Sequence, residues 1–189
     1  TLPRNSTHSA SRRPPSLRVA LFFCALAGRR PSGATHGGRM TFSRFFVVGG
    51  AGFIGSHLVD RLGDRGPVTV FDDLSTGRRD NVVSQLEAGR ARLVQGSALE
   101  LEALTRAMQH HDVVFLGAEP DATDRTYLDR HLAITRNVLE AMRHTRARLL
   151  LFPSTGEVYG ATCEYCSEED LGELPRSVYG AAKLACEAM

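Results

Sequence analysis

Two residues near the end of the chain have types and a spacing that support acid–base chemistry. Lys183 is the only lysine among 23 basic residues, and Tyr179 stands four positions before it in a helical pattern. Residues four apart share one face of a helix, so the ammonium group would lie beside the phenol. Because its charge stabilises a phenolate, we expect the tyrosine pKa to fall below about 10 and its oxygen to take a proton from a hydroxyl group. The apolar face that this helix should bury consists of Ala182, Leu184, Ala185 and Ala188.

A second candidate site begins with a run of glycines. Residues 49–55, with the sequence GGAGFIG, follow an apolar run and open a helical pattern. Glycine allows a tight turn and lets the backbone approach a pyrophosphate, whose charge then meets free N–H groups at the positive end of a helix. The residues that we expect to contact a dinucleotide are Gly49, Gly52, Phe53, Ile54 and Gly55.

Asp72 determines which dinucleotide is expected. It ends the next apolar run, 17 residues after Gly55. A carboxylate there can accept hydrogen bonds from both hydroxyl groups of an adenosine ribose, and it repels a 2′-phosphate. The sequence therefore predicts NAD rather than NADP as the cofactor, although Arg78 and Arg79 in the following loop reduce the expected preference.

These residues need a scaffold, and the rest of the chain predicts one. Strands are expected at residues 45–50, 67–71, 91–95, 112–116 and 148–152, and helices at 53–62, 80–88, 99–110 and 126–143. Strands that alternate with helices require crossover connections, which favour a parallel sheet covered on both faces. The predicted fold class is α/β, a doubly wound parallel sheet of the Rossmann type, truncated before a substrate-binding C-terminal portion.

Composition separates the beginning of the chain from the remainder. The chain has 189 residues, of which 42% are hydrophobic and 23% charged, and this excludes collagen-like, disordered and disulfide-scaffold classes. The first 40 residues hold seven Arg and no acid, which leaves 16 basic against 21 acidic residues in the rest. An acidic remainder disfavours nucleic-acid binding. No apolar run has the roughly 18 residues that a membrane span requires.

Two interpretations of residues 1–40 stay open. The apolar stretch 19–27, preceded by arginines, is compatible with a secretory signal segment, whereas a disordered tail or upstream extension before Met40 better suits a cytoplasmic nicotinamide-nucleotide enzyme. We therefore divide the chain into a tail, residues 1–40, and an incomplete NAD-binding domain, residues 41–189. The helical pattern at Met189 has no stop signal and predicts a fragment, which we expect to be inactive alone.

The cysteines do not predict a metal site. They are scattered and too few for a disulfide scaffold. Cys163 and Cys166 have the spacing of half a zinc site, but the sequence contains no second pair to complete it. We expect reduced thiols at Cys24, Cys163, Cys166 and Cys186.

The motifs together resemble the extended short-chain dehydrogenase/reductase family, in particular its NAD-dependent nucleotide-sugar epimerases and dehydratases. The resemblance covers residues 44–189 and rests on GGAGFIGSHLVDRL, VFDDLSTGRRDNV, STGEVYG and YGAAK, which occur in order. It implies a Tyr179–Lys183 pair that acts on the sugar, with Lys183 also holding the nicotinamide ribose and Thr155 hydrogen-bonding the reacting oxygen. It further implies hydride transfer to and from NAD, a transient keto-sugar, a nucleotide-sugar substrate and a homodimer when full length. No membrane or nucleic-acid partner is implied.

Glu157 leaves the reaction class open. In the families that the chain resembles, 4,6-dehydratases and glucuronate decarboxylases carry Glu here, where it could act as a base beside the keto-sugar. Epimerases often carry a small neutral residue, and a helix-capping or solvated Glu is the alternative for this chain. Gly156 replaces the Asp that dehydratases place before this Glu. The predicted function is thus an NAD-dependent epimerase/dehydratase; the alternatives are a dehydratase or decarboxylase that uses Glu157, or a dinucleotide-binding fragment without catalysis.

Three cofactor-contact positions depart from the family pattern and predict a reduced affinity for NAD. Where the family has HLAA after the fourth predicted strand, this chain has Leu116-Gly117-Ala118-Glu119. Where the family has GD after the third strand, it has Gly96-Ser97, and His131 replaces the family's Asn four residues before Thr135. We expect His131 to be a helix-surface or groove residue and not a catalyst.

Overall fold

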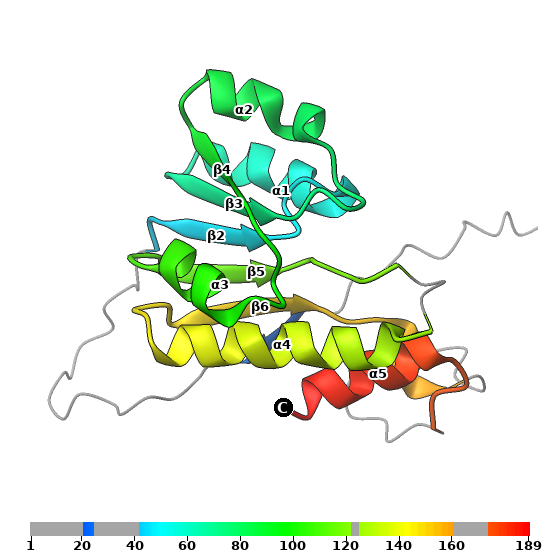
Figure 1. The fold of residues 1–189 in the computed structure, drawn as a ribbon. Coiled ribbons are helices and arrows are strands. Elements are labelled where there is room, and N and C mark those ends of the chain that lie inside the picture. Colours follow the sequence, from blue (N-terminus) through cyan, green and yellow to red (C-terminus); the bar gives the residue numbers. More distant parts are fainter. Residues whose placement is uncertain (1–20, 25–41, 122–124, 161–173) are drawn as a thin grey trace, which may run out of the picture.

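A six-stranded sheet with helices on both faces forms the centre of the protein (Figure 1). The computed structural model describes residues 21–24, 42–121, 125–160 and 174–189. The strands are β1 (Leu21–Cys24), β2 (Phe45–Val48), β3 (Val68–Asp72), β4 (Ala91–Gln95), β5 (Val113–Leu116) and β6 (Leu149–Pro153). Their order across the sheet is β1-β6-β5-β2-β3-β4. Strands β2 to β6 are parallel, which confirms the predicted doubly wound α/β fold.

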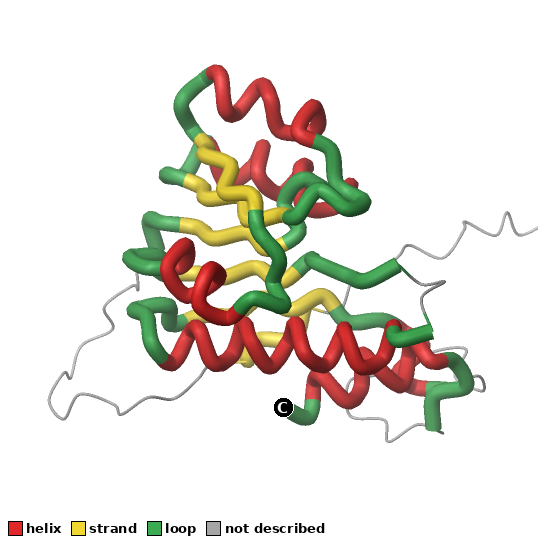
Figure 2. The backbone as a smooth tube through the Cα atoms, viewed as in Figure 1, coloured by secondary structure: helices red, strands yellow, loops and turns green. Residues whose placement is uncertain are grey.

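The helices follow the predicted alternation. They are α1 (Phe53–Gly63), α2 (Val83–Glu87), α3 (Leu101–Met108), α4 (Tyr127–Arg143) and α5 (Val178–Glu187). Two short 3-10 helices, η1 (Arg79–Val82) and η2 (Gly156–Tyr159), lie in the connections. In Figure 2 the helices form layers around the central strands, and the arrowheads of Figure 1 show the parallel strands ending at one edge of the sheet. Residues that follow these strands therefore meet at that edge.

The core has two halves because successive strand residues point to opposite faces of the sheet. Phe46 and Val48 of β2 join the cluster that includes Leu104 of α3 and Val138 of α4. Phe45 and Val47 join the cluster on the other face, together with Val59 of α1. All four residues of β2 are buried, as expected for a central strand of a parallel sheet. The glycine loop that follows β2 is thereby attached to a strand that is buried along its whole length.

Strand β1 is an element that the sequence pattern does not predict. It lies within the apolar stretch 19–27 and pairs antiparallel with β6, with Leu21 opposite Pro153. The remainder of residues 1–40 lies outside the described residues, so both interpretations of this segment stay predictions. No helix in the described ranges is long and apolar enough to cross a membrane.

The buried face of α5 differs from the expected one. Leu184 is 37% exposed and Ala188 is also exposed, so the prediction is wrong for both. Leu184 lies two residues from the buried Ala182 and therefore on nearly the opposite side of the helix. The residues that α5 buries are Gly180, Ala182, Lys183 and Cys186. The lysine thus belongs to the buried face, and its ammonium group must find partners inside the protein.

Candidate active site

The glycine loop between β2 and α1 is packed too tightly for larger residues. Gly49 has a φ of 75°, and a Cβ there would lie 2.5 Å from the backbone nitrogen of Ala118. A Cβ at Gly55 would lie 2.2 Å from the carbonyl oxygen of Gly49. At Gly52 the nearest atom would be 3.4 Å away, which is ordinary contact. Gly49 and Gly55 are therefore required by the turn itself, and Gly52 leaves space on the groove side.

Replacing Gly55 should disrupt this loop. We expect Gly55→Ala to lower the free energy of unfolding by about 1–3 kcal/mol, because the new Cβ collides with backbone that cannot rotate away. Urea unfolding of the wild type and the variant measures the change. Gly156→Ala is the matched control, since a Cβ at Gly156 meets nothing within 4 Å, and it should be close to neutral. Equal stabilities of the two variants would contradict this account of the loop.

A groove opens beside the glycine loop at the carboxyl ends of the strands. It has a volume of about 270 Å³ and is lined by residues that follow β2, β3, β4 and β5, among them Gly49, Gly52, Asp72, Gly96 and Glu119. β2 lies between β3 and β5 in the sheet, so the chain changes direction across the sheet at this point. Doubly wound sheets bind dinucleotides in such a crevice.

Asp72 is held at the floor of this groove with its carboxylate already oriented. The side chain is 7% exposed, and its two oxygens accept hydrogen bonds from the backbone N–H groups of Ala51 at 2.9 Å and Leu74 at 2.8 Å. Each carboxylate oxygen has a second acceptor position, so both could still accept a hydroxyl group. The site fits an adenosine ribose. Phe53 and Ile54, by contrast, are 79% and 60% exposed, so only their backbone at the start of α1 could serve a ligand in the groove.

Tyr179 and Thr155 meet at the neighbouring strand end. Thr155 follows β6, and its side chain hydrogen-bonds to that of Tyr179 on α5. The tyrosine pKa is nevertheless raised above 10, because burial and then the negative charges of Glu119 and Glu157 outweigh this hydrogen bond. The expectation of a lowered pKa is therefore wrong for this arrangement. The physical reason is chiefly the burial of the phenol, while the charge of Lys183 is paired with Glu119.

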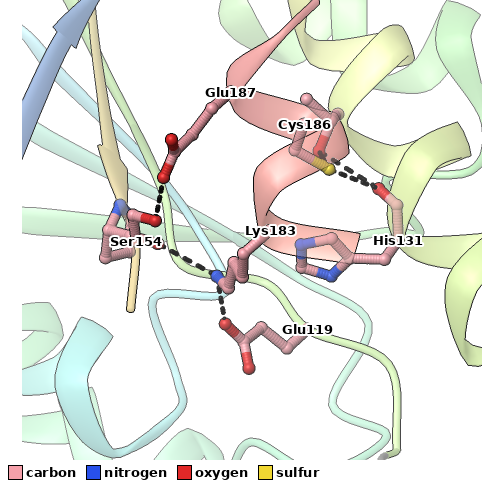
Figure 3. Close-up of polar contacts among 8 residues, drawn as sticks. Glu119, His131, Ser154, Lys183, Cys186 and Glu187 are labelled. Atoms are coloured by element: carbon pink, nitrogen blue, oxygen red, sulfur yellow. Dashed lines mark hydrogen bonds and ion pairs between the residues drawn. The ribbon is translucent and has the colours of Figure 1, made fainter. Parts of the chain in front are cut away.

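Lys183 is buried, and Figure 3 shows its Nζ directed toward the carboxylate of Glu119. It is 1% exposed, and its Nζ donates a hydrogen bond to the carbonyl oxygen of Pro153 at 3.0 Å. The same nitrogen forms an ion pair with Glu119, which follows β5. It also lies 4.7 Å from the ring centre of Phe152 and 5.7 Å from that of Tyr179. The ammonium is thus near the phenol ring, as the spacing predicts, but its closest anion is Glu119.

Glu157 contacts the beginning of α5. Its carboxylate accepts a hydrogen bond from the hydroxyl of Ser177, and Ser177 in turn accepts one from the backbone N–H of Gly180 at 2.9 Å. Ser177 is the N-cap of α5, so Glu157 supports the helix that carries Tyr179. Ser154, the alternative to Thr155 as a partner of the reacting oxygen, donates instead to Glu187.

His131 lies inside the protein rather than on the surface of α4. It is 2% exposed and stacks on Tyr127, with ring centres 5.5 Å apart. Burial and the nearby charge of Lys183 lower its pKa to about 4. Within the described residues neither ring nitrogen has a hydrogen-bond partner. The expectation of a helix-surface or groove position is wrong, because α4 is covered on this side by α5 and His131 does not line the groove.

The structure therefore assembles two clusters from the predicted residues. Gly49, Gly52 and Asp72 line the groove, while Thr155, Tyr179 and Lys183 gather where α5 meets the end of β6. Glu119 joins the clusters, since it lines the groove and pairs with Lys183. The sequence analysis assigns it no role, although its departure from the HLAA pattern marks the position.

Metal ligands are not gathered in the part of the chain that the structure describes. No group of three or more His, Cys, Asp or Glu side chains there could hold a metal ion. Cys163 and Cys166 lie outside the described residues. Cys186 is a buried free thiol that accepts a hydrogen bond from Thr135 at 3.2 Å.

Comparison with known proteins agrees with this geometry. The model of the NAD dependent epimerase/dehydratase family matches residues 45–189. The chain belongs to this family. Both clusters described above lie within the matched residues.

Relatives within the epimerase/dehydratase family include proteins of more than one activity. The UDP-glucose 4-epimerase of Azospirillum brasilense is 36% identical over 155 residues, which cover 77% of this chain and 43% of the relative. UDP-glucuronic acid decarboxylase 1 of Arabidopsis thaliana is 35% identical over 159 residues, covering 77% and 35% of the two chains. The crystal structure of UDP-glucose 4-epimerase from Brucella ovis in complex with NAD has a TM-score of 0.68 and 29% identity, covering 78% of this chain and 46% of the other. The chain spans less than half the length of these relatives.

Proposed function

We propose that this chain is the NAD-binding part of an NAD-dependent nucleotide-sugar epimerase/dehydratase. The observation that carries the proposal is the meeting of two clusters at one edge of the sheet: the glycine loop with Asp72, and the Thr155–Tyr179–Lys183 group. The former fits a dinucleotide and the latter fits a proton transfer beside it. Membership of the family and the NAD complex of the Brucella ovis relative support the same function.

Each predicted residue has a task in this mechanism. Asp72 binds the adenosine ribose, the glycine loop and the start of α1 face the pyrophosphate, and Lys183 holds the nicotinamide ribose. When bound, NAD would supply a reversible hydride acceptor: it would take a hydride from the sugar carbon, leaving a keto-sugar, and would give the hydride back afterwards. Tyr179 exchanges the proton of the reacting sugar hydroxyl, and Thr155 orients this hydroxyl through the same hydrogen-bond network.

Epimerisation is the reaction that the position of Glu157 favours. The carboxylate is bound to Ser177 at the N-cap of α5, where it supports the catalytic helix and is not free to attack a substrate proton. A decarboxylase or dehydratase that uses Glu157 is the second candidate, and the Arabidopsis thaliana relative favours it. Glu157→Gln separates them: an epimerase keeps turnover, whereas an enzyme that needs the carboxylate as a base loses most of it.

The surroundings of the enzyme are part of the proposal. A nucleotide-sugar, with UDP as the nucleotide in the named relatives, is the substrate. We place the enzyme in the cytoplasm, where NAD and nucleotide-sugars are available, and expect the full-length protein to be a homodimer. Gel filtration of the full-length protein with light scattering tests the oligomeric state.

Cofactor choice gives a direct test of the site. We expect NAD to bind at least about tenfold more tightly than NADP, because Asp72 would lose its ribose hydrogen bonds and face a phosphate. Calorimetric titration of the chain with both nucleotides measures the ratio. Asp73→Asn is the control, since Asp73 is the adjacent acid and its carboxylate accepts hydrogen bonds from the backbone N–H and the hydroxyl of Ser75 in the following loop. It should leave the ratio nearly unchanged. Equal or inverted affinities in the wild type would remove Asp72 from its role.

A further inference from the structure

Glu119 forms an ion pair with Lys183, the lysine that the proposed mechanism needs for the cofactor. Its carboxylate pairs with Nζ of Lys183, and a second N–H of that nitrogen is taken by the carbonyl oxygen of Pro153. The remaining side of the ammonium faces the rings of Phe152 and Tyr179. An ammonium has three N–H donors, so one remains beside these two contacts, and it lies on the side of the rings; a ribose with two hydroxyl groups would need a donor that Glu119 now holds.

The two partners of this ion pair differ in how easily they move. The Lys183 side chain is 2% exposed and is fixed on the buried face of α5, whereas the Glu119 side chain is 37% exposed at the edge of the groove. Glu119 can therefore swing toward solvent at low cost, while Lys183 stays where it is. When the ion pair breaks, the Glu119 side chain moves and the ammonium of Lys183 becomes accessible from the groove.

The acidic side chains of the groove also weaken the binding of an anionic ligand. Among the described residues, the lining of the groove carries four acidic side chains, Asp72, Asp73, Glu119 and Asp121, against the one basic side chain of Arg130. A dinucleotide brings a negatively charged pyrophosphate into this lining, so each nearby carboxylate weakens its binding. Glu119 alone among these acids is shown in contact with Lys183.

We propose that Glu119 determines the cofactor affinity of this chain by competing with the ribose of the dinucleotide for Lys183. The proposal rests on the proposed function, since it requires that the groove takes NAD and that Lys183 contacts it. Without cofactor, the Glu119 carboxylate takes the place beside Lys183 Nζ that a ribose hydroxyl group would take. NAD binding displaces its carboxylate, and the free energy of the broken ion pair is subtracted from the binding free energy.

Calorimetry with NAD provides the first measurement. Glu119→Gln keeps the shape of the side chain and removes its charge, and it should raise the affinity of the chain for NAD about three- to tenfold. Glu119→Ala should raise it at least as much. Asp73→Asn is the matched control, because it removes an acid from the same groove lining and Asp73 accepts its hydrogen bonds from Ser75. It should raise the affinity less, because it leaves the ion pair between Glu119 and Lys183 in place.

The single lysine provides a second measurement that needs no cofactor. Reductive methylation with formaldehyde modifies amines, so within this sequence it reports on Lys183, with the α-amino group of the chain as an internal reference. Glu119→Gln should speed methylation of Lys183 about threefold or more, while the reference amine and Lys183 of the Asp73→Asn protein stay at the wild-type rate. NAD should protect Lys183 in the wild type and in the variant.

The outcomes separate this proposal from the proposed function. Equal NAD affinities and equal methylation rates in the wild type and both Glu119 variants overturn the competition and leave NAD binding intact. A lower affinity in Glu119→Gln shows that the glutamate assists the cofactor, which also overturns it. Absence of NAD binding in the wild type and in every variant overturns the proposed function together with the competition. Thermal unfolding of each variant confirms that the fold persists.

Discussion

Tyr179→Phe in the full-length enzyme should lower turnover about 10²- to 10⁴-fold, the range typical of removing a positioned proton-transfer group. The ring of Tyr179 keeps its packing in the variant, while the oxygen that meets Thr155 is lost. NAD binding should remain nearly unchanged, because Asp72 and the glycine loop lie on other elements. Steady-state assays with UDP-sugars and calorimetry with NAD give the two quantities separately.

A neighbouring tyrosine supplies the control for this variant. Tyr127 lies on α4 with its ring centre 6.4 Å from that of Tyr179, and it is 5% exposed. Tyr127→Phe makes the same chemical change without touching the Thr155 hydroxyl, and turnover should stay within a few-fold of the wild type. Normal turnover of Tyr179→Phe would overturn the assignment. Equal losses in both variants would indicate a packing effect instead of proton transfer.

The raised pKa of Tyr179 adds a pH dependence to this reaction. Burial, followed by the charges of Glu119 and Glu157, keeps the phenol protonated at neutral pH. A tyrosine that must accept a proton is then mostly in the wrong form, so turnover should rise as the pH increases toward the tyrosine pKa. If Glu119 leaves Lys183 when the cofactor binds, the ammonium becomes available to the phenolate and the rise should move to lower pH.

The sequence predicts the scaffold well because short-range patterns determine it. The apolar runs that became β2, β3, β4, β5 and β6 are short and bounded by turn residues, and glycines follow β2 where the turn has no room for a Cβ. Asp72 could be placed for the same reason, since it ends a strand and parallel strands end at one edge. The predicted helix at 80–88 divides into η1 and α2, which changes no contact with the groove.

The electrostatics of the site could not be predicted in this way. Tyr179 and Lys183 share a helix, so their proximity follows from spacing, but the partner of the ammonium comes from the loop after β5. That pairing depends on tertiary contacts, and so does the burial of the phenol, which is the largest cause of the raised tyrosine pKa. The buried position of His131 likewise depends on α5 covering α4. Spacing along one helix therefore predicts that Tyr179 and Lys183 lie close together, whereas the anion that pairs with Lys183 depends on the tertiary fold.

His131 should make the stability of the protein sensitive to acid. Its pKa is about 4 in the folded protein, against an ordinary value of 6.5, chiefly because of burial and secondly because of Lys183; Glu119 opposes the shift. Between these values the unfolded chain binds a proton that the folded chain does not bind. The free energy of unfolding should therefore fall as the pH decreases from about 6.5 to 4, by on the order of 2–3 kcal/mol from this residue.

Urea unfolding at several pH values isolates the contribution of this histidine. His131→Phe retains a ring to stack on Tyr127 and has no titrating group, so its stability should fall less than that of the wild type over the same pH range. His111 is also buried with a lowered pKa, but it is present in both proteins and cancels in the difference. Parallel stability curves for the wild type and His131→Phe would contradict the assignment, because the buried imidazole would then bind its proton equally well in the folded and unfolded chains.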